Sequence, residues 1–225
     1  MTKTLEAEPV GREKPLSKTA KLMARHMGTA WQAPMFGITV EVDMEAAMAR
    51  RTEGVTLTDV ILSDCAATLA EHPAVNAHYR DDTIVEYDDI NVGLAVASDR
   101  GLTVPVVRNA ARLSLAGIAE RRRALVGKVR DGKIAITDVV GGTFTISNLG
   151  MFDVKRFTAI INPPQVAILA VGGTSRRQVW NDGDPQWRQI SELTLTCDHR
   201  ALDGAQAASF MAALKKRLEK EAPAN

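Results

Sequence analysis

The sequence predicts an α/β fold in which one mixed sheet carries packed helices, giving a two-layer sandwich. Three observations support this prediction. Segments with the period-2 alternation of a half-buried strand, such as residues 36–43, recur along the chain among segments with helical spacing. No internal repeat or low-complexity linker divides the chain. Its 225 residues, 45% of them hydrophobic, suffice for a substantial core, and one sheet covered by helices is the simplest architecture.

In the first half of the chain, apolar residues at helical spacing predict helices over 16–27 and 45–51. A third helix is predicted to begin at a cap, Thr58 or Asp59, and to end at Pro73. Extended segments are predicted at 36–43, 83–87, 90–97 and 102–107, with a turn at Asp99-Arg100-Gly101. Pro105 interrupts the last of them, which predicts an edge position or a bulge because proline cannot donate to a ladder.

In the second half, Ser114 is predicted to open a helix that contains Arg121-Arg122-Arg123. Adjacent helical residues point in different directions, so the three arginines predict a solvated face rather than a phosphate site. Strands are predicted over 143–147, over the apolar run 166–171, which is typical of a central strand, and before Asp198, with a hairpin-like turn at 181–185. Asp203 is predicted to cap a last helix, with Ala207, Phe210, Met211, Leu214 and Leu218 along one stripe.

Composition excludes several classes of function. A net charge of +1 gives no support for nucleic-acid or membrane binding. Cys65 and Cys197 lack CxxC spacing and predict neither a disulfide framework nor a metal site. No signal peptide or long apolar run is evident, which predicts a cytoplasmic location. The expected organisation is a flexible arm (1–15), one catalytic domain (16–220) and a polar tail (221–225).

The stretch from Asp198 to Gly204 carries the clearest chemistry. His199 is placed in a short strand-to-helix connection, where a side chain can be held firmly and still reach a ligand. A histidine side chain has a reference pKa near 6.5 and, when neutral, can take a proton from a thiol or hydroxyl. These few residues alone are equally compatible with a catalytic site and with an ordinary surface loop. Other parts of the sequence are needed to distinguish the two.

Several blocks, in order, carry a resemblance to a known family. Asp198-His199-Arg200-Ala201-Leu202-Asp203-Gly204 resembles the DHRxxDG signature of the catalytic domain of 2-oxo-acid dehydrogenase acyltransferases, the dihydrolipoamide acyltransferases. Residues 141–150 (GGTFTISNLG) resemble the second signature of that family. Met151-Phe152 and residues 157–165 are most similar to the pyruvate dehydrogenase acetyltransferase, and residues 91–96 and 101–106 also match family patterns. The resemblance covers about residues 14–220.

The resemblance implies a chloramphenicol-acetyltransferase-like fold and a homotrimer whose active site lies between subunits. It implies that His199 is the general base, that Ser147 of the adjacent subunit donates a hydrogen bond to the tetrahedral oxyanion, and that Asp203 holds the loop in shape. Acyl transfer from a thioester needs such a base and such a donor. An alternative for Ser147 is a hydroxyl that only satisfies its own turn. Further candidates along the substrate channel are Asn148, Asp153, Asp198, Arg200 and Gly204.

Departures from the family pattern bear on function. Many members have an arginine in the first helix that pairs with the carboxylate matching Asp203, whereas this chain has Ala20 there, with Lys18 or Lys21 as possible substitutes. Asp153 stands where the pyruvate-type enzymes usually have glycine, and its charge would disfavour an anionic ligand nearby. No lipoyl-lysine motif is evident and the polar tail offers no apolar anchor, which predicts a lone trimer without a swinging arm.

Three functions are compatible with these features. The first is a stand-alone acyltransferase that moves acetyl from acetyl-CoA, a co-substrate, to the hydroxyl of a small or carrier-bound molecule; relatives of this kind acetylate glyceryl-derived tetronates in natural-product pathways. The second keeps a dihydrolipoyl acceptor delivered by another protein. The third is an inactive trimeric scaffold, against which the presence of His199, Ser147 and Asp203 together argues. The first is the expected function, and no metal is expected.

Overall fold

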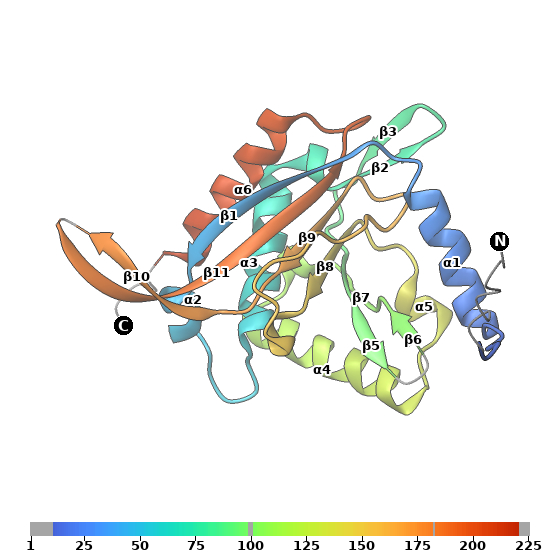
Figure 1. Ribbon diagram of the computed structural model, residues 1–225, viewed down its shortest axis with the longest axis horizontal. Helices are drawn as coiled ribbons and strands as arrows, with labels where there is room; N and C mark the ends of the chain where they lie inside the picture. Colours follow the sequence, from blue (N-terminus) through green and yellow to red (C-terminus); the bar gives the residue numbers. More distant parts are fainter. Residues whose placement is uncertain (1–10, 99–100, 182, 221–225) are drawn as a thin grey trace, which may run out of the picture.

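The computed structural model describes residues 11–98, 101–181 and 183–220. Most of the predicted N-terminal arm, the predicted polar tail (221–225) and the Asp99-Arg100 part of a predicted turn lie outside the described residues. A mixed sheet forms the centre of the described chain (Figure 1). Its strands run in the order β1 (Met35–Asp43), β11 (Asp184–Asp198), β9 (Ala167–Val171), β8 (Phe144–Asn148), β4 (Val92–Leu94) and β7 (Val106–Val107), and β10 (Ser175–Asn181) pairs with β11.

Strands β4, β8 and β9 are parallel, and their other neighbours pair antiparallel. Two small hairpins lie outside the sheet: β2 (Ala77–Arg80) with β3 (Thr83–Glu86), and β5 (Val96–Ser98) with β6 (Gly101–Thr103). The helices are α1 (Lys18–Ala30), α2 (Glu45–Ala49), α3 (Leu57–Glu71), α4 (Leu115–Asp131), α5 (Ile136–Val139) and α6 (Gly204–Leu218), with 3-10 turns η1 (Pro73–Val75), η2 (Ala110–Arg112) and η3 (Gly150–Phe152).

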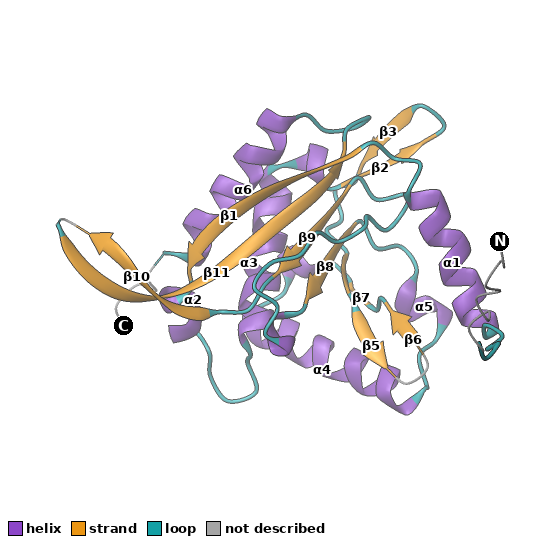
Figure 2. Cartoon of the chain, viewed as in Figure 1, coloured by secondary structure: helices purple, strands orange, loops and turns teal. Residues whose placement is uncertain are grey.

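The alternation of strand side chains assigns the two faces of the sheet. Phe144 and Ile146 of β8 point into the main core, to which α3 and α6 contribute. Figure 2 shows these helices gathered on one face, with α1 apart from them near α5. Because successive strand residues point to opposite sides, Thr145 and Ser147 face away from that core. This second face carries a smaller apolar cluster that includes Ile168 and Ala170.

The predicted α/β two-layer class is confirmed, and so are its main elements. The run at 166–171 forms the central strand β9, and β7, which follows Pro105, is the last strand at one edge of the sheet. The predicted segment 90–97 is divided between β4 and β5.

Two local predictions were wrong. The cap of α3 is Thr56, and Asp59 is the third residue of its capping box. Arg122 does not belong to a solvated face, because its guanidinium binds the buried carboxylate of Asp59, with Nε 2.5 Å from Oδ1 and Nη2 3.0 Å from Oδ2. Thr56 donates both its backbone N–H and its hydroxyl to that carboxylate.

Candidate active site

The loop that carries His199 is held at both ends by backbone hydrogen bonds. Strand β11 ends at Asp198, whose N–H donates to Val166 O and whose carbonyl accepts from the N–H groups of Ala201 and Leu202. The backbone N–H of His199 donates to Pro34 O at 2.9 Å. The loop therefore has a defined path between the sheet and α6.

Asp198 and Arg200 form a bidentate ion pair with each other. Arg200 Nε lies 2.9 Å from Asp198 Oδ1 and Nη2 lies 2.6 Å from Oδ2, and the backbone N–H of Arg200 donates to the same carboxylate. Hydrogen bonding to Asp198 raises the pKa of the Arg200 guanidinium, which also stacks 4.1 Å from the centre of the Tyr79 ring. Because Asp198 is 1% exposed and fully engaged, the pair shapes the loop.

The imidazole of His199 is exposed in the single chain. Its ring centre lies 4.6 Å from that of Phe36, at a tilt of 48°. Burial raises the pKa of the preceding thiol, Cys197, to about 12, so this thiol is protonated at neutral pH. The His199 imidazole is therefore held on a fixed loop and is accessible at this end of the sheet.

Asp203 caps α6 as predicted. Its Oδ1 accepts from the Gln206 N–H at 2.8 Å, and Gln206 Oε1 accepts from the Asp203 N–H at 3.1 Å. Among the described side chains no ion pair reaches Asp203 from Lys21, and the side chain of Lys18 lies outside those described. Gly204 begins the helix, with open space where a Cβ would stand.

Ser147 and its neighbours lie at the end of β8. Ser147 is half-buried and pairs with Ala170 of β9. Asn148 donates to the Thr58 hydroxyl at 3.1 Å and accepts from the Gly150 N–H at 2.8 Å, so it shapes the turn after the strand. Asp153 is exposed and has a left-handed backbone (φ 57°), a conformation that glycine adopts freely and aspartate tolerates.

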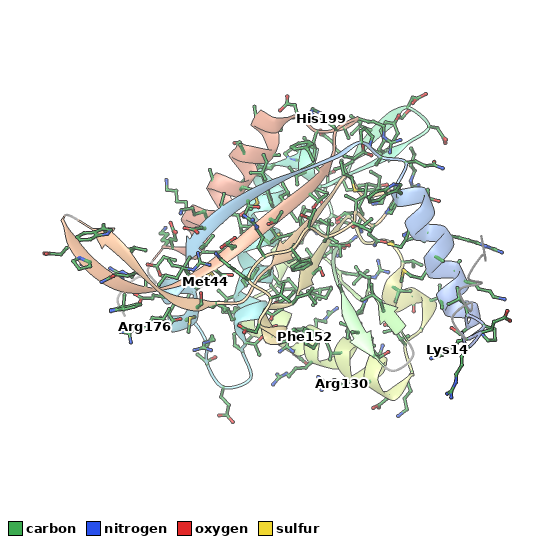
Figure 3. All side chains as sticks on the ribbon, viewed as in Figure 1. Lys14, Met44, Arg130, Phe152, Arg176 and His199 are labelled. Carbon is green, nitrogen blue, oxygen red and sulfur yellow. The ribbon has the colours of Figure 1, made fainter. Side chains whose placement is uncertain are left out.

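The sheet holds His199 and Ser147 apart. Cys197 pairs with Ala167 at one end of β9, whereas Ser147 pairs with Ala170 near the other. About five residue positions along the strands and two strands across place the two residues about 19 Å apart. Figure 3 shows His199 and Phe152, which follows Ser147 by a few residues, at opposite ends of the sheet. One chain therefore brings His199, Asp198, Arg200 and Asp203 together, but does not bring Ser147 to them.

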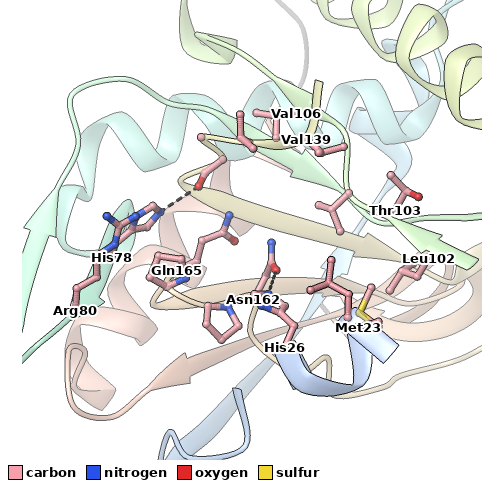
Figure 4. Close-up of a pocket in the computed structure, with 17 residues that line it drawn as sticks. Met23, His26, His78, Arg80, Leu102, Thr103, Val106, Val139, Asn162 and Gln165 are labelled. Atoms are coloured by element: carbon pink, nitrogen blue, oxygen red, sulfur yellow. Dashed lines mark hydrogen bonds between the residues drawn. The ribbon is translucent and has the colours of Figure 1, made fainter. Parts of the chain in front are cut away.

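A polar network two residues before Ser147 was not predicted from the sequence. Thr145 donates its hydroxyl to Gln165 Oε1 at 2.6 Å, and Asn162 connects Thr145 to His26. Three members of this network, His26, Asn162 and Gln165, line a cavity of about 550 Å³ (Figure 4). The period-2 alternation of β8 puts Thr145 on the same face as Ser147, so this pattern could have predicted that the two side chains are neighbours. Its partners come from α1 and from the turn before β9, which no local pattern relates to β8.

The fold and these residues define an acyltransferase catalytic domain. Residues 8–224 match the family model described as "2-oxoacid dehydrogenases acyltransferase (catalytic domain)". The chain therefore belongs to the 2-oxoacid dehydrogenase acyltransferase family. It is 39% identical over 91% of its length to the dihydrolipoyllysine-residue acetyltransferase component of the mitochondrial pyruvate dehydrogenase complex of Schizosaccharomyces pombe, of which it covers 45%. The chain spans about half the length of the curated relatives it matches.

Solved structures agree with this assignment. A probable dihydrolipoamide acetyltransferase from Listeria monocytogenes superimposes with a TM-score of 0.91 at 34% identity, covering 96% of this chain and 97% of that one. The dihydrolipoamide acetyltransferase of Azotobacter vinelandii gives 0.91 at 31%, covering 95% and 93%. A cubic core of the pyruvate dehydrogenase multienzyme complex gives 0.90 at 29%, covering 95% and 93%. Chloramphenicol acetyltransferase, at 16% identity and a TM-score of 0.59 over 86% and 94%, shares the fold, which confirms the predicted fold class.

None of the described helices is long and apolar enough to cross a membrane. The same part of the chain contains no group of three or more histidine, cysteine, aspartate or glutamate side chains placed to hold a metal ion.

Proposed function

We propose that the chain transfers an acetyl group from acetyl-CoA, at sites built from His199 of one copy and Ser147 of the next. The spacing of these residues supports this most directly. In the Azotobacter vinelandii enzyme, a serine, a histidine 52 residues later and an asparagine four residues further on were investigated for their roles in the catalytic mechanism. Ser147, His199 and Asp203 have the same spacing, with aspartate in the last position.

The separation within one chain supports a site shared between copies. A general base and an oxyanion donor act on the same tetrahedral centre, so they must lie within a few ångströms of each other. About 19 Å separates them in the single chain, while the His199 imidazole is exposed at one end of the sheet and Ser147 is half-buried near the other. A closed trimer, in which each copy offers both ends, meets this requirement.

The reaction then follows from the residue types. The His199 imidazole takes the proton of the acceptor thiol or hydroxyl as that atom attacks the thioester carbonyl. The Ser147 hydroxyl donates to the oxyanion of the tetrahedral intermediate. When the carbon–sulphur bond to CoA breaks, the imidazolium returns the proton to the leaving sulphur. Asp203, Asp198 and Arg200 keep the loop that carries His199 in place.

A dihydrolipoyl thiol is the acceptor that we propose first, ahead of the hydroxyl acceptor favoured by the sequence. The names of the relatives support it, since they are dihydrolipoyllysine-residue acetyltransferases. The second candidate remains the hydroxyl of a small molecule, such as a glyceryl tetronate. One observation favours it: Asp153 puts an exposed carboxylate a few residues after Ser147, where the pyruvate-type pattern has glycine.

Release of CoA from acetyl-CoA tests the proposal. The protein is assayed with dihydrolipoamide and with a panel of hydroxylated acceptors that includes glyceryl tetronates. Rapid release with dihydrolipoamide supports the first acceptor, and release only with a hydroxyl compound, together with its acetyl ester, supports the second. No transfer to any acceptor supports the scaffold alternative.

The assembly and its setting are further proposals. We propose a homotrimer formed by one domain over residues 16–220, located in the cytoplasm. The cubic core among the similar structures makes a larger cage the competing assembly. Sedimentation velocity distinguishes a lone trimer from a cage of many copies.

A further inference from the structure

The cavity near the start of β8 has apolar walls and a polar floor. It holds about 550 Å³ between α1, the β6–β7 segment and the turn that precedes β9. The walls are formed by Met23, Leu102, Val104, Val106, Val139 and Val140. The floor carries the amide side chains of Asn162 and Gln165, which point into the cavity in Figure 4. A site with apolar walls and a few fixed polar groups is typical of small-molecule binding.

The hydrogen-bond network fixes how the two amides are turned. The hydroxyl of Thr145 donates to Gln165 Oε1, so the Gln165 carbonyl oxygen is occupied. His26 Nε2 lies 2.8 Å from Asn162 Oδ1, and Asn162 Nδ2 lies 3.5 Å from the Thr145 oxygen. Both amide oxygens are therefore used in the floor, and Gln165 Nε2 and the second N–H of Asn162 Nδ2 remain to donate to a molecule in the cavity.

The amide nitrogen of Gln165 lacks a hydrogen-bond partner in the described part of the chain, although the residue is only 4% exposed. It lies against Gly142, where a Cβ would stand 3.1 Å from Gln165 Nε2 and 3.2 Å from Val106. Gln165 lines the cavity, so its Nε2 can donate to an acceptor oxygen of a molecule held there.

The position of the floor relates it to the reaction. Thr145 and Ser147 are two residues apart on β8 and face the same side of the sheet, about 7 Å apart along the strand. Neither residue lines the cavity itself, but the Thr145 hydroxyl is hydrogen-bonded to Gln165 and Asn162, which do. The cavity floor therefore lies within the length of a small molecule whose reacting sulphur or oxygen is at Ser147. A carbonyl oxygen several bonds from the reacting atom would reach the Gln165 and Asn162 nitrogens.

We propose that this cavity holds the body of the acyl acceptor, and that Gln165 and Asn162 select acceptors with a carbonyl oxygen by donating hydrogen bonds to it. The inference rests on the proposed acyl transfer at Ser147 and deepens it. Dihydrolipoamide carries such a carbonyl in its carboxamide and a glyceryl tetronate carries one in its lactone, so the cavity suits either source.

Two dithiols that differ only at the carbonyl end test the selection. Dihydrolipoamide and octane-1,3-dithiol share the reacting thiols, but the second has no carbonyl group. The expected kcat/KM of the full-length protein is about tenfold higher with dihydrolipoamide, mainly through KM, since one buried hydrogen bond is worth about that factor. The same comparison of kcat/KM is made between a glyceryl tetronate and its glyceryl analogue without the lactone. A preference for the tetronate would identify the lactone as the source of the carbonyl oxygen.

Gln165→Glu tests whether the amide donor of Gln165 causes this preference. It keeps an oxygen for the Thr145 hydroxyl and replaces the amide donor by an acceptor. The variant is expected to lose the preference for dihydrolipoamide, because its kcat/KM falls by a larger factor with dihydrolipoamide than with octane-1,3-dithiol. Gln178→Glu makes the same substitution on the exposed hairpin strand β10 and is expected to keep the preference. Equal losses with both dithiols, or none with either, would overturn the proposal.

Binding separates this inference from the proposed chemistry. Calorimetry with oxidised lipoamide requires no turnover, and Gln165→Glu is expected to weaken its Kd by about tenfold. An unchanged Kd would refute the cavity assignment even where acetyl transfer is observed. Weakened binding without any transfer would instead sustain the cavity and reject the proposed activity.

Discussion

At the scale of single residues, the tasks proposed for His199 and Ser147 can be tested separately. We expect His199→Ala to lower kcat for acetyl transfer by about 10²–10⁴-fold because the acceptor loses its base. Ser147→Ala is expected to lower kcat by about 10²–10³-fold because one oxyanion donor is lost. Steady-state CoA release measures both effects, and sedimentation checks that each variant keeps the assembly of the parent. Unchanged turnover in His199→Ala would remove the proposed mechanism.

Two substitutions at Asp203 separate its helix cap from its negative charge. Its carboxylate accepts from the Gln206 N–H at the start of α6, so Asp203→Ala is expected to cost about 1 kcal/mol of unfolding free energy. Asparagine caps helices as well as aspartate does, so Asp203→Asn is expected to keep both stability and turnover. Urea unfolding and CoA release, measured in parallel, check the pair. Equal damage in both variants would show that the negative charge itself is needed.

The surroundings of His78 lead us to expect that the stability of the protein depends on pH. Its Nε2–H donates to Gly142 O, so the neutral ring accepts at Nδ1 from the Tyr87 hydroxyl at 3.0 Å and from Arg80 Nη2 at 3.1 Å. Burial, the largest cause, and the nearby Arg80 charge lower the pKa of this histidine. The unfolded chain therefore binds this proton at higher pH than the folded chain, and the stabilisation is lost as the pH falls below about 6.5.

The measurement for His78 is the free energy of unfolding between pH 7.5 and 5.5. His78→Gln keeps a donor for Gly142 O and removes the titrating group. We expect the parent protein to lose stability relative to this variant across that interval. Parallel curves for the two proteins would contradict the assignment of a lowered pKa.

At the scale of elements, one buried ion pair joins α3 to α4. Asp59 has a fully buried side chain and both of its oxygens bind Arg122, while Thr56 donates to it as well. Arg122→Leu would leave that carboxylate without its countercharge, for which we expect a loss of about 3–5 kcal/mol. Arg121→Leu, on the exposed side of the same helix, should stay within about 0.5 kcal/mol. Urea unfolding compares them, and equal effects would show that the pair adds nothing specific.

The same elements show what the sequence could and could not predict. Asp203 was predicted as a cap because the cap and its partner Gln206 are three residues apart, within the reach of a local pattern. Arg122 was assigned to solvent because its partner Asp59 lies 63 residues earlier and only the packing of two helices joins them. Thr145 was passed over for a similar reason, since Gln165 reaches it from a turn rather than from the same strand.

At the scale of the whole molecule, the order of the strands could not be read from the residues. The resemblance supplied the chloramphenicol-acetyltransferase-like fold and the proposed roles of His199 and Ser147, but the distance between them depends on the register of β11, β9 and β8. That register is set by long-range pairing, which carries no local signature. It turns a spacing of 52 residues into a separation of about 19 Å within one chain, and so makes assembly part of the proposed mechanism.

Mixed trimers test this dependence on assembly. A copy with Ser147→Ala still offers His199, and a copy with His199→Ala still offers Ser147. When the two are co-expressed with different tags and trimers containing both are purified, each closed trimer should hold one intact site among three. We therefore expect about a third of the parent's turnover, far above either variant alone. Turnover no higher than the mean of the two variants would place both residues in the same copy's site, and would require a large rearrangement of the sheet.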